Sequence, residues 1–399
     1  MAIKLVIKNS INKLTNSKVF NQEKNFTKIE INKILKNLKS NKNSFSALNN
    51  NFKLGFKNSD LKKFKKYKQI AILGMGGSIL GIKAIFNFFE HKIKKKFYFF
   101  DNLNELKIYD FNKKKNLNEI LFIIVSKSGN TLETLTNFDV INKNKINKNN
   151  IIVITDNKKN NILNKLIKKY NPYCIEHKTY IGGRYSVLSE AGMLPSFLMG
   201  LNIKNFKKNI KKNLRKYIIK KLIDSVPQIS HLYLSKKINS IILFNYCPEL
   251  KNFTYWCQQL MAESLGKKGK GLLPVVSNAP KDHHSLLQLY LDGPKDKVFY
   301  IFSAKSKINL KLKNNFYSNK KLKFKDVIKA QKLSFIKVLK SKKIPYREIE
   351  INSFDEDTLS QLFTYFMLET ALVGKIINVN PFDQPAVEEV KILTRKYLS

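Results

Sequence analysis

Residues 126–134, with the sequence SKSGNTLET, carry four side-chain hydroxyls in a single turn. They follow a run of apolar residues and come before a helical pattern, so the turn lies at a predicted helix N-terminus. A phosphate monoester has three acceptor oxygens, which hydroxyls, a glycine and a helix N-terminus can satisfy together. Capping alone does not need so many hydroxyls, and the surplus favours a phosphate cradle over a simple helix cap beginning at Thr131.

A second turn, GMGGS at residues 74–78, lies between a short apolar run and an apolar helical pattern. Glycines let backbone N–H groups face an anion, and Ser78 can cap the helix or donate its hydroxyl. The same glycines also suit tight packing of a strand against a helix, and both interpretations stay open. The spacing differs from GxGxxG because Gly81 comes too late, which disfavours a dinucleotide site.

Arg184 and Glu263 are the candidates for charge chemistry. Arg184 stands among glycines in IGGRYS, residues 181–186, of an Arg-poor chain. A fixed guanidinium there could hold an anion or a developing oxyanion, with a surface ion pair as the alternative. Glu263, in QQLMAESLGK at 258–267, has small and apolar neighbours that could raise its pKa toward that of a useful base. A solvated glutamate near a helix end is the more common situation.

The segment DHHSLLQ, residues 282–288, holds two of the five histidines. Adjacent histidines point in different directions, so at most one acts in any single site, and a lone histidine is usually structural. No matching ligand stands at helical spacing nearby, which disfavours a metal site. Further along, Asp383 is a candidate cap for a C-terminal helix that holds Lys391 two turns on, and nothing local distinguishes that lysine.

Apolar runs that alternate with helical patterns must position these motifs. The strand candidates are 70–73, the apolar start of 119–138, 150–157, 240–246, 297–303 and 345–351. The clearest helix candidates are 252–265, 326–341 and 356–377. Such alternation predicts an α/β fold of parallel sheets, each flanked by helices on both faces.

The length of 399 residues exceeds what one hydrophobic core usually serves, so we expect two domains. Residues 1–68 are polar, rich in Lys and Asn and weakly periodic, which predicts an N-terminal helical lead-in. The Lys-rich span 202–222 is typical of a helix that joins two α/β units. We therefore predict a first α/β subdomain at 69–200 and a second at 201–399 with a C-terminal helix.

The composition excludes whole-chain disorder, because apolar residues make up 43% and aromatic residues 12%. No apolar run reaches the roughly 18 residues of a membrane span, and the opening residues lack a signal-peptide core. The three cysteines, Cys174, Cys247 and Cys257, have no metal-ligand spacing, which favours structural thiols in a reducing compartment. Together these features predict a cytoplasmic protein.

The formal net charge is +45, from 74 Lys plus Arg against 29 Asp plus Glu. A field of this sign attracts nucleic acid and phosphorylated metabolites alike. The excess is nearly all Lys, spread along the chain with many Asn, Ile and Phe, residues that share A/T-rich codons. This pattern favours a solvated lysine surface over a dedicated nucleic-acid face, and a DNA-binding protein remains the alternative that the charge motivates.

Taken together and in order, the motifs resemble those of the phosphoglucose isomerase family. The matching segments are GxGGSxLG at 74–81, SKSGxTxET at 126–134, GGRxS at 182–186, QQxxxES with the following GK at 258–267, the helix-leading His284, and FDQxxVExxK at 382–391. The match runs from about residue 70 to the C-terminus and leaves out residues 1–68. Leu265, Pro385 and Ala386 depart from residues common in the family, and none of them is a proposed catalytic side chain.

The resemblance implies two sugar-isomerase subdomains and a metal-free, cofactor-free interconversion of glucose 6-phosphate and fructose 6-phosphate. Glu263 would move the proton between carbons 1 and 2, and Arg184 would stabilise the enediolate. His284 and Lys391 would assist opening of the sugar ring, with His284 supplied across the interface of a homodimer. The residues implied around the phosphate are Gly77, Ser78, Ser126, Ser128 and Thr131, with Lys127 and Gln259 nearby.

Two other functions remain open from the sequence. One is a related phosphosugar isomerase that acts on mannose 6-phosphate or an amino sugar. The other is a non-catalytic regulator that binds a phosphosugar on the same fold. A sensor needs the phosphate loop but no base, so the presence of Glu263 together with Arg184 argues against it.

Overall fold

A computed structural model gives the fold. It describes residues 4–10, 18–40, 42–113, 119–141, 146–157, 161–306, 308–314 and 321–399. The chain forms two compact units. We call residues 35–212 the middle unit, and residues 1–34 together with 213–399 the terminal unit. No helix in the described ranges is long and apolar enough to cross a membrane.

The middle unit is built on a five-stranded sheet with the order β3-β2-β4-β5-β6. Its strands are β2 (Gln69–Gly74), β3 (Lys96–Phe100), β4 (Ile120–Val125), β5 (Ile151–Thr155) and β6 (Tyr173–Glu176). All neighbouring strands pair in parallel. The sequence of β4, ILFIIV, is buried at every position, because helices cover both faces of such a sheet.

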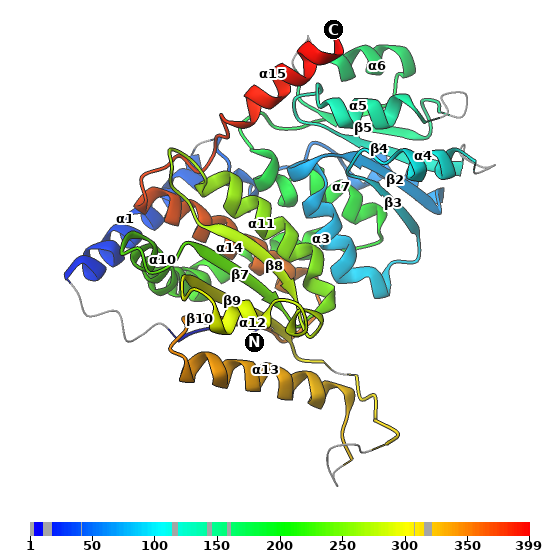
Figure 1. Ribbon diagram of the computed structural model, residues 1–399. Coiled ribbons are helices and arrows are strands. Elements are labelled where there is room, and N and C mark those ends of the chain that lie inside the picture. The colour runs from blue at the N-terminus through cyan, green and yellow to red at the C-terminus, as the bar shows by residue number, and fades with distance from the viewer. Residues whose placement is uncertain are drawn as a thin grey trace. The chain divides into compact units, whose positions relative to one another are not determined.

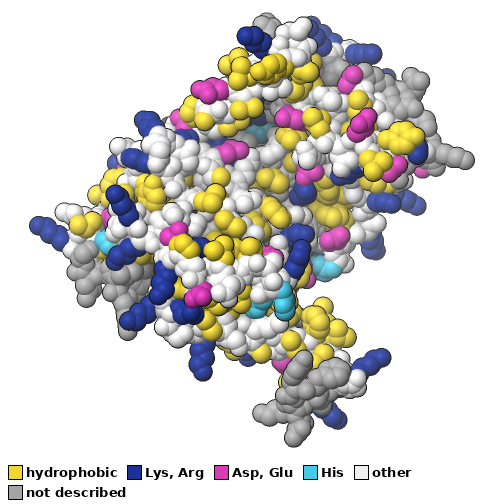
Figure 2. Space-filling model, in the orientation of Figure 1, with side chains coloured by type: hydrophobic (Ala, Val, Ile, Leu, Met, Phe, Trp, Pro, Cys, Tyr) yellow, Lys and Arg dark blue, Asp and Glu magenta, His cyan; other side chains and the backbone are white. Residues whose placement is uncertain are grey.

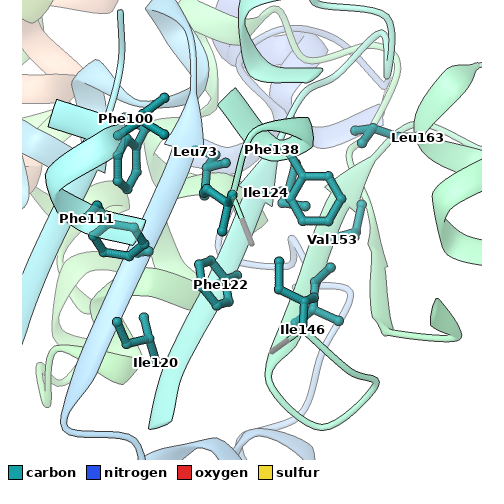
Figure 3. Close-up of a cluster of buried hydrophobic side chains, with 14 residues drawn as sticks. Leu73, Phe100, Phe111, Ile120, Phe122, Ile124, Phe138, Ile146, Val153 and Leu163 are labelled. Atoms are coloured by element: carbon teal, nitrogen blue, oxygen red, sulfur yellow. The ribbon is translucent and has the colours of Figure 1, made fainter. Parts of the chain in front are cut away.

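Helices α4 (Glu105–Asn112), α5 (Leu132–Asp139) and α6 (Ile162–Tyr170) cover one face of this sheet. Figure 3 shows Phe111, Phe138 and Leu163 from these helices packed around Phe122 and Val153 of the strands. Full burial of such a side chain contributes about 1.5–3 kcal/mol, so this cluster fixes the helices on the sheet. The turns that follow the strands are therefore attached to a rigid support.

The terminal unit has a second five-stranded sheet, with the order β1-β10-β9-β7-β8. Its strands are β1 (Leu5–Asn9), β7 (Ser240–Asn245), β8 (Leu273–Asn278), β9 (Lys297–Ala304) and β10 (Tyr346–Ile351). The pairings are parallel except that β1 runs antiparallel to β10. The predicted α/β fold with two largely parallel, helix-flanked sheets is confirmed, with one antiparallel edge strand added.

Helices also lie on both faces of the second sheet (Figure 1). They are α10 (Ile219–Leu234), α11 (Lys251–Leu265), α12 (Leu287–Asp292), α13 (Phe324–Ser341) and α14 (Glu356–Ile376). The last helix, α15 (Val387–Leu398), has no buried residue. On one face, Tyr290 of α12 and Phe335 of α13 pack on Phe299 of β9. On the other, Phe253 of α11 contacts Phe302 of β9 and Phe366 of α14. Helix α11 is thereby held directly against the sheet.

The N-terminal segment contains more than the predicted helix. Helix α1 (Lys18–Ser40) includes the periodic stretch 29–38, but residues 5–9 form the edge strand β1. The side chain of Asn9 accepts a hydrogen bond of 2.6 Å from Arg347, a fully buried residue that forms an ion pair with Glu369. The strand depends on these distant partners, and no pattern within five residues could reveal them.

The lysine-rich span contains α8 (Ile203–Lys208), α9 (Ile210–Asn213) and a π-helical turn (Leu214–Ile218) that continues into α10. The two compact units meet along the chain at residues 212 and 213, inside this span. Lysine and arginine side chains lie scattered over the face drawn in Figure 2 and do not gather in one patch. That scatter agrees with a solvated lysine surface.

Candidate active site

In the middle unit, the GMGGS turn lies directly against the GGRYS segment. Strand β2 ends at Gly74 and α3 (Leu80–Phe89) begins after a short turn, while a 3-10 helix begins at Gly183. A Cβ atom on Gly77 would collide with the backbone of Gly183 and Arg184. Only glycine permits this approach, so Gly77 brings the buried Arg184 next to the GMGGS turn.

Ser78 does not cap the helix that follows it. The N-cap residue of α3 is Ile79, and no side chain caps this end. The hydroxyl of Ser78 is half-buried at the carboxyl end of β2. The capping role considered for Ser78 is therefore wrong.

The hydroxyls of the SKSGNT turn pair with each other instead of capping α5. Thr131 occupies the N-cap position, yet its side chain accepts no capping bond. Its Oγ1 lies 2.9 Å from the Oγ of Ser126, which is buried at the end of β4. Ser128 is exposed, and its Oγ accepts a bond of 3.3 Å from the N–H of Asn130. The simple helix-cap alternative does not describe this turn.

Asn161 packs against the SKSGNT turn at Gly129, and it was not predicted from the sequence. A Cβ on Gly129, whose φ is +66°, would collide with the Asn161 side chain. The Asn161 amide donates to Asp156 Oδ1 at 3.2 Å, and its oxygen accepts from the N–H of Asn164 at 2.7 Å. Asp156 in turn donates its backbone N–H to the carbonyl of Lys127 at 3.0 Å. An Asn after an apolar strand and before a helical run was the available signal.

His177 is a second residue that sequence reasoning missed. It is buried just after β6, and its N–H donates to the carbonyl of Thr155 at 2.7 Å. Burial, with a smaller contribution from the Lys127 charge, lowers the pKa of His177 to about 4. Nε2 is buried and makes no hydrogen bond with the described residues. At physiological pH the imidazole near the Lys127 charge of the SKSGNT turn is therefore neutral.

In the terminal unit, α11 carries Gln259 and Glu263 one turn apart. The Gln259 amide donates a bond of 2.7 Å to Glu263 Oε1. Gln258 instead faces β8 and donates to the carbonyl of Pro274 at 3.0 Å. Glu263 is half-buried. Gln259, expected near the phosphate, is thus the immediate partner of the proposed base.

The C-terminal end of α11 is tied to the FDQ segment. Lys267 Nζ donates to the carbonyls of Ser264 at 3.0 Å and Asn380 at 2.6 Å, and lies 3.3 Å from Asp383 Oδ1. Asp383 does not cap α15, whose N-cap residue is Ala386 without a side-chain cap. The capping role expected for Asp383 is therefore wrong, because its carboxylate is engaged by Lys267.

The two adjacent histidines lie in different surroundings. His283 is half-buried, with Nε2 2.7 Å from the hydroxyl of Tyr246 and its ring stacked on Phe244. His284 is exposed on the same turn. Of the two side chains, that of His284 is the more accessible to a substrate or to another subunit.

Lys391 is exposed on α15, and its Nζ lies 2.7 Å from Oε1 of Glu388 on the same helix. The cysteines Cys174, Cys247 and Cys257 are free thiols. In the ranges that the structure describes, no cluster of His, Cys, Asp and Glu could hold a metal ion.

Solved structures share this fold along nearly the whole chain. A Thermus thermophilus hypothetical protein matches with a TM-score of 0.82 and 21% identity, over 99% of this chain and 100% of the other. A glucose-6-phosphate isomerase of Chlamydia trachomatis matches with a TM-score of 0.69 and 18% identity, over 86% and 72% of the two chains. The fold is therefore one that phosphosugar isomerases use.

Sequence relatives give the family. The model of phosphoglucose isomerase matches residues 11–274. The glucose-6-phosphate isomerase of Methanocaldococcus jannaschii is 31% identical over 346 residues, which cover 83% of this chain and 85% of that one. That of Campylobacter jejuni is 30% identical over 358 residues, with 84% and 86% covered. The chain belongs to the phosphoglucose isomerase family, and the resemblance drawn from its motifs is confirmed.

Proposed function

We propose that this protein interconverts glucose 6-phosphate and fructose 6-phosphate, a step of glycolysis and gluconeogenesis. The observation that carries the proposal is membership of the family along most of the chain, with relatives of at least 30% identity that bear this enzyme's name. This agreement supports the predicted aldose–ketose isomerase. It does not favour a mannose-specific enzyme or a non-catalytic regulator.

The middle unit supplies the groups that hold the phosphate in this proposal. The hydroxyls of Ser126 and Thr131, which pair at 2.9 Å, turn toward phosphate oxygens when the substrate binds. Ser78, the Gly77 backbone, Ser128 and the Lys127 charge complete the set. The phosphate is remote from the reacting carbons, so its binding energy serves to fix the sugar in place.

The terminal unit supplies the base. Glu263 removes the proton from one of carbons 1 and 2 and returns it to the other, through a cis-enediol or enediolate. Gln259, bonded to Oε1 at 2.7 Å, holds the carboxylate in one orientation. The negative oxygen that develops in the enediolate needs a nearby positive group, and the buried guanidinium of Arg184 is proposed for this role.

Ring opening is assigned to His284 and Lys391. Both side chains are exposed in a single copy of the chain. An exposed His284 beside a packed His283 suits a residue that serves a second copy, and we propose a homodimer in which it does so. The proposed enzyme works in the cytoplasm, where its phosphorylated substrates are formed and used.

The test is a coupled assay on fructose 6-phosphate, with mannose 6-phosphate supplied in parallel, repeated in heavy water. We expect glucose 6-phosphate as the product, with deuterium at carbon 2, because the abstracted proton exchanges with solvent in part. Absence of both product and deuterium would refute the proposal. Faster turnover of mannose 6-phosphate than of fructose 6-phosphate would favour the related isomerase.

A further inference from the structure

The carboxylate of Asp282 accepts hydrogen bonds that stabilise the turn carrying His284. One carboxylate oxygen accepts a bond of 2.6 Å from the N–H of Asn278, and the other accepts from Ser285 Oγ at 3.0 Å. The N–H of His284 donates to the carbonyl of Lys281 at 3.0 Å. The bonds from Ser285 and His284 stay within the turn, and the bond from Asn278 joins the turn to the end of β8.

The bond between Tyr246 and His283 attaches the same turn to a second strand end, that of β7. Tyr246 follows β7 and His283 follows β8, two strands that pair in parallel. The hydroxyl and Nε2 are 2.7 Å apart, and the imidazole stacks on Phe244 with ring centres 5.7 Å apart. Burial, then the neighbouring His284, lowers the pKa of His283, which favours the neutral ring. A neutral imidazole Nε2 accepts from the tyrosine O–H in one tautomer and donates to its oxygen in the other.

A residue next to a fixed side chain has a fixed backbone. The imidazole of His283 cannot rotate without losing its bond and its stacking contact, so the direction in which His284 leaves the backbone is also set. Leaving the buried Tyr246 hydroxyl without a partner would be costly, which holds the arrangement in place. None of the roles assigned above uses either Tyr246 or His283.

We infer that Tyr246 and His283 are positioning residues that aim His284 at the sugar ring and so set the rate of ring opening. The inference rests on the proposed function and deepens it. In ring opening the bond between carbon 1 and the ring oxygen breaks, the carbon 1 hydroxyl loses its proton, and the ring oxygen gains one. A carbonyl forms at carbon 1. A histidine displaced by about 1 Å can slow such a proton transfer by as much as about 100-fold.

The experiment separates ring opening from isomerisation by placing the variants in a Glu263→Gln background. That background cannot isomerise but still interconverts the two cyclic anomers of glucose 6-phosphate, and NMR exchange spectroscopy measures this rate. We expect Tyr246→Phe to slow anomer exchange by about 5- to 30-fold, the loss expected for one buried hydrogen bond and a shifted turn. The KM for fructose 6-phosphate, measured with Glu263 intact, stays within about twofold of wild type because the phosphate groups are untouched.

Tyr290→Phe is the matched control. Tyr290 is buried in the same aromatic cluster and contacts Phe244, but its hydroxyl lies 2.6 Å from Ser277 Oγ instead of a histidine. This variant loses a comparable bond without freeing the turn, so its anomer exchange stays at the parent rate. A purely structural effect would slow both variants alike.

A pair of substitutions at His283 gives an independent result if Tyr246→Phe fails to fold. His283→Gln keeps a hydrogen-bond partner for the tyrosine, so we expect most of the anomer exchange rate to remain. His283→Leu removes that partner, so we expect exchange to slow as it does in Tyr246→Phe. Equal rates for the Gln and Leu variants, or equal rates for Tyr246→Phe and Tyr290→Phe, overturn the inference. A wild-type protein that isomerises normally then leaves the proposed function standing, while an inactive wild type refutes that function first.

Discussion

The middle unit and the terminal unit contribute different kinds of group to the proposed reaction. The proposed phosphate turns of the middle unit consist mainly of backbone, glycines and neutral hydroxyls, with the charge of Lys127, and they follow two neighbouring strands. The acid–base residues of the terminal unit are side chains on a helix and on a turn, held by bonds such as Lys267 to Asn380, 113 residues apart. In this proposal, each anion-binding turn is formed by residues close in the sequence, whereas the orientation of the base depends on contacts distant in the sequence.

The largest expected effect comes from removing the base. Glu263→Gln should lower kcat by about 10² to 10⁴-fold, the usual contribution of a positioned general base. Binding of the phosphosugar should change little, because Gln259 and the phosphate turns remain. Steady-state kinetics and a direct binding titration measure the two effects, and Glu348→Gln, a half-buried carboxylate on β10, is the control. Turnover near that of wild type would show that the base lies elsewhere.

The corresponding change in the middle unit removes the paired hydroxyls. Ser126→Ala combined with Thr131→Ala should raise KM by about 10- to 100-fold, because each lost bond to a charged phosphate is worth about 1.5–3 kcal/mol before other groups compensate. Thr136→Ala, on the exposed side of α5, is the matched control. An unchanged KM would remove this turn from the binding site. A large fall in kcat at constant KM would contradict the division of binding and acid–base roles between the two units.

A smaller effect should follow when the Lys267 bonds at the end of α11 are removed. Lys267→Met removes the bonds to Ser264, Asn380 and Asp383, so the helix end that follows Glu263 becomes less well fixed. We expect kcat to fall by about two- to tenfold at constant KM, with a lower Tm, since lost hydrogen bonds of this kind cost about 1–3 kcal/mol. Lys268→Met, an exposed neighbour, serves for comparison. Equal kcat in both variants would mean that the Lys267 bonds do not contribute to catalysis.

The smallest effect concerns His177 and the pH dependence of stability. Its pKa is about 4 in the folded protein and near 6.5 when unfolded, so between these values only the unfolded chain takes up the proton. The contribution to stability is complete above pH 6.5 and is lost as the pH falls toward 4. His177→Asn should therefore show a shallower loss of Tm over this range. His91→Asn, an exposed histidine, should leave the slope unchanged, and equal slopes for both would contradict the buried, neutral state.

The strands that were predicted from the sequence differ in composition from those that were not. ILFIIV of β4 is a continuous apolar run and was predicted, as were β2, β5, β7, β9 and β10. Strands β1, β3, β6 and β8 were missed. Strand β8 contains Pro274, which usually argues against a central strand, and it is tolerated here because β8 lies at the edge of its sheet. Short strands of this kind are specified by their neighbours, not by their own composition.

The same division holds for the candidate site. The hydroxyl turn and the glycine turn were predicted because their residue types and spacing are unusual within a few positions, and Glu263 was predicted from the motif that holds it. The roles of Asn161 and His177 were missed, since each acts through burial beside a turn that is distant in the sequence. Ser78 and Asp383 were considered as caps because local rules favour such residues before helices, and tertiary contacts gave them other surroundings.

The amino-acid sequence by itself determined the α/β class, the order of six motifs and the family to which they belong. Only the tertiary structure decided that Gly77 packs on Arg184, that Lys267 holds Asp383 and that Tyr246 binds His283. Strand, turn and helix signals arise from side-chain periodicity over a few residues. A contact between residues tens or hundreds of positions apart forms only when the intervening chain has folded. The conformational entropy that the chain then loses is offset by burial of the whole core, and not by the two residues in contact.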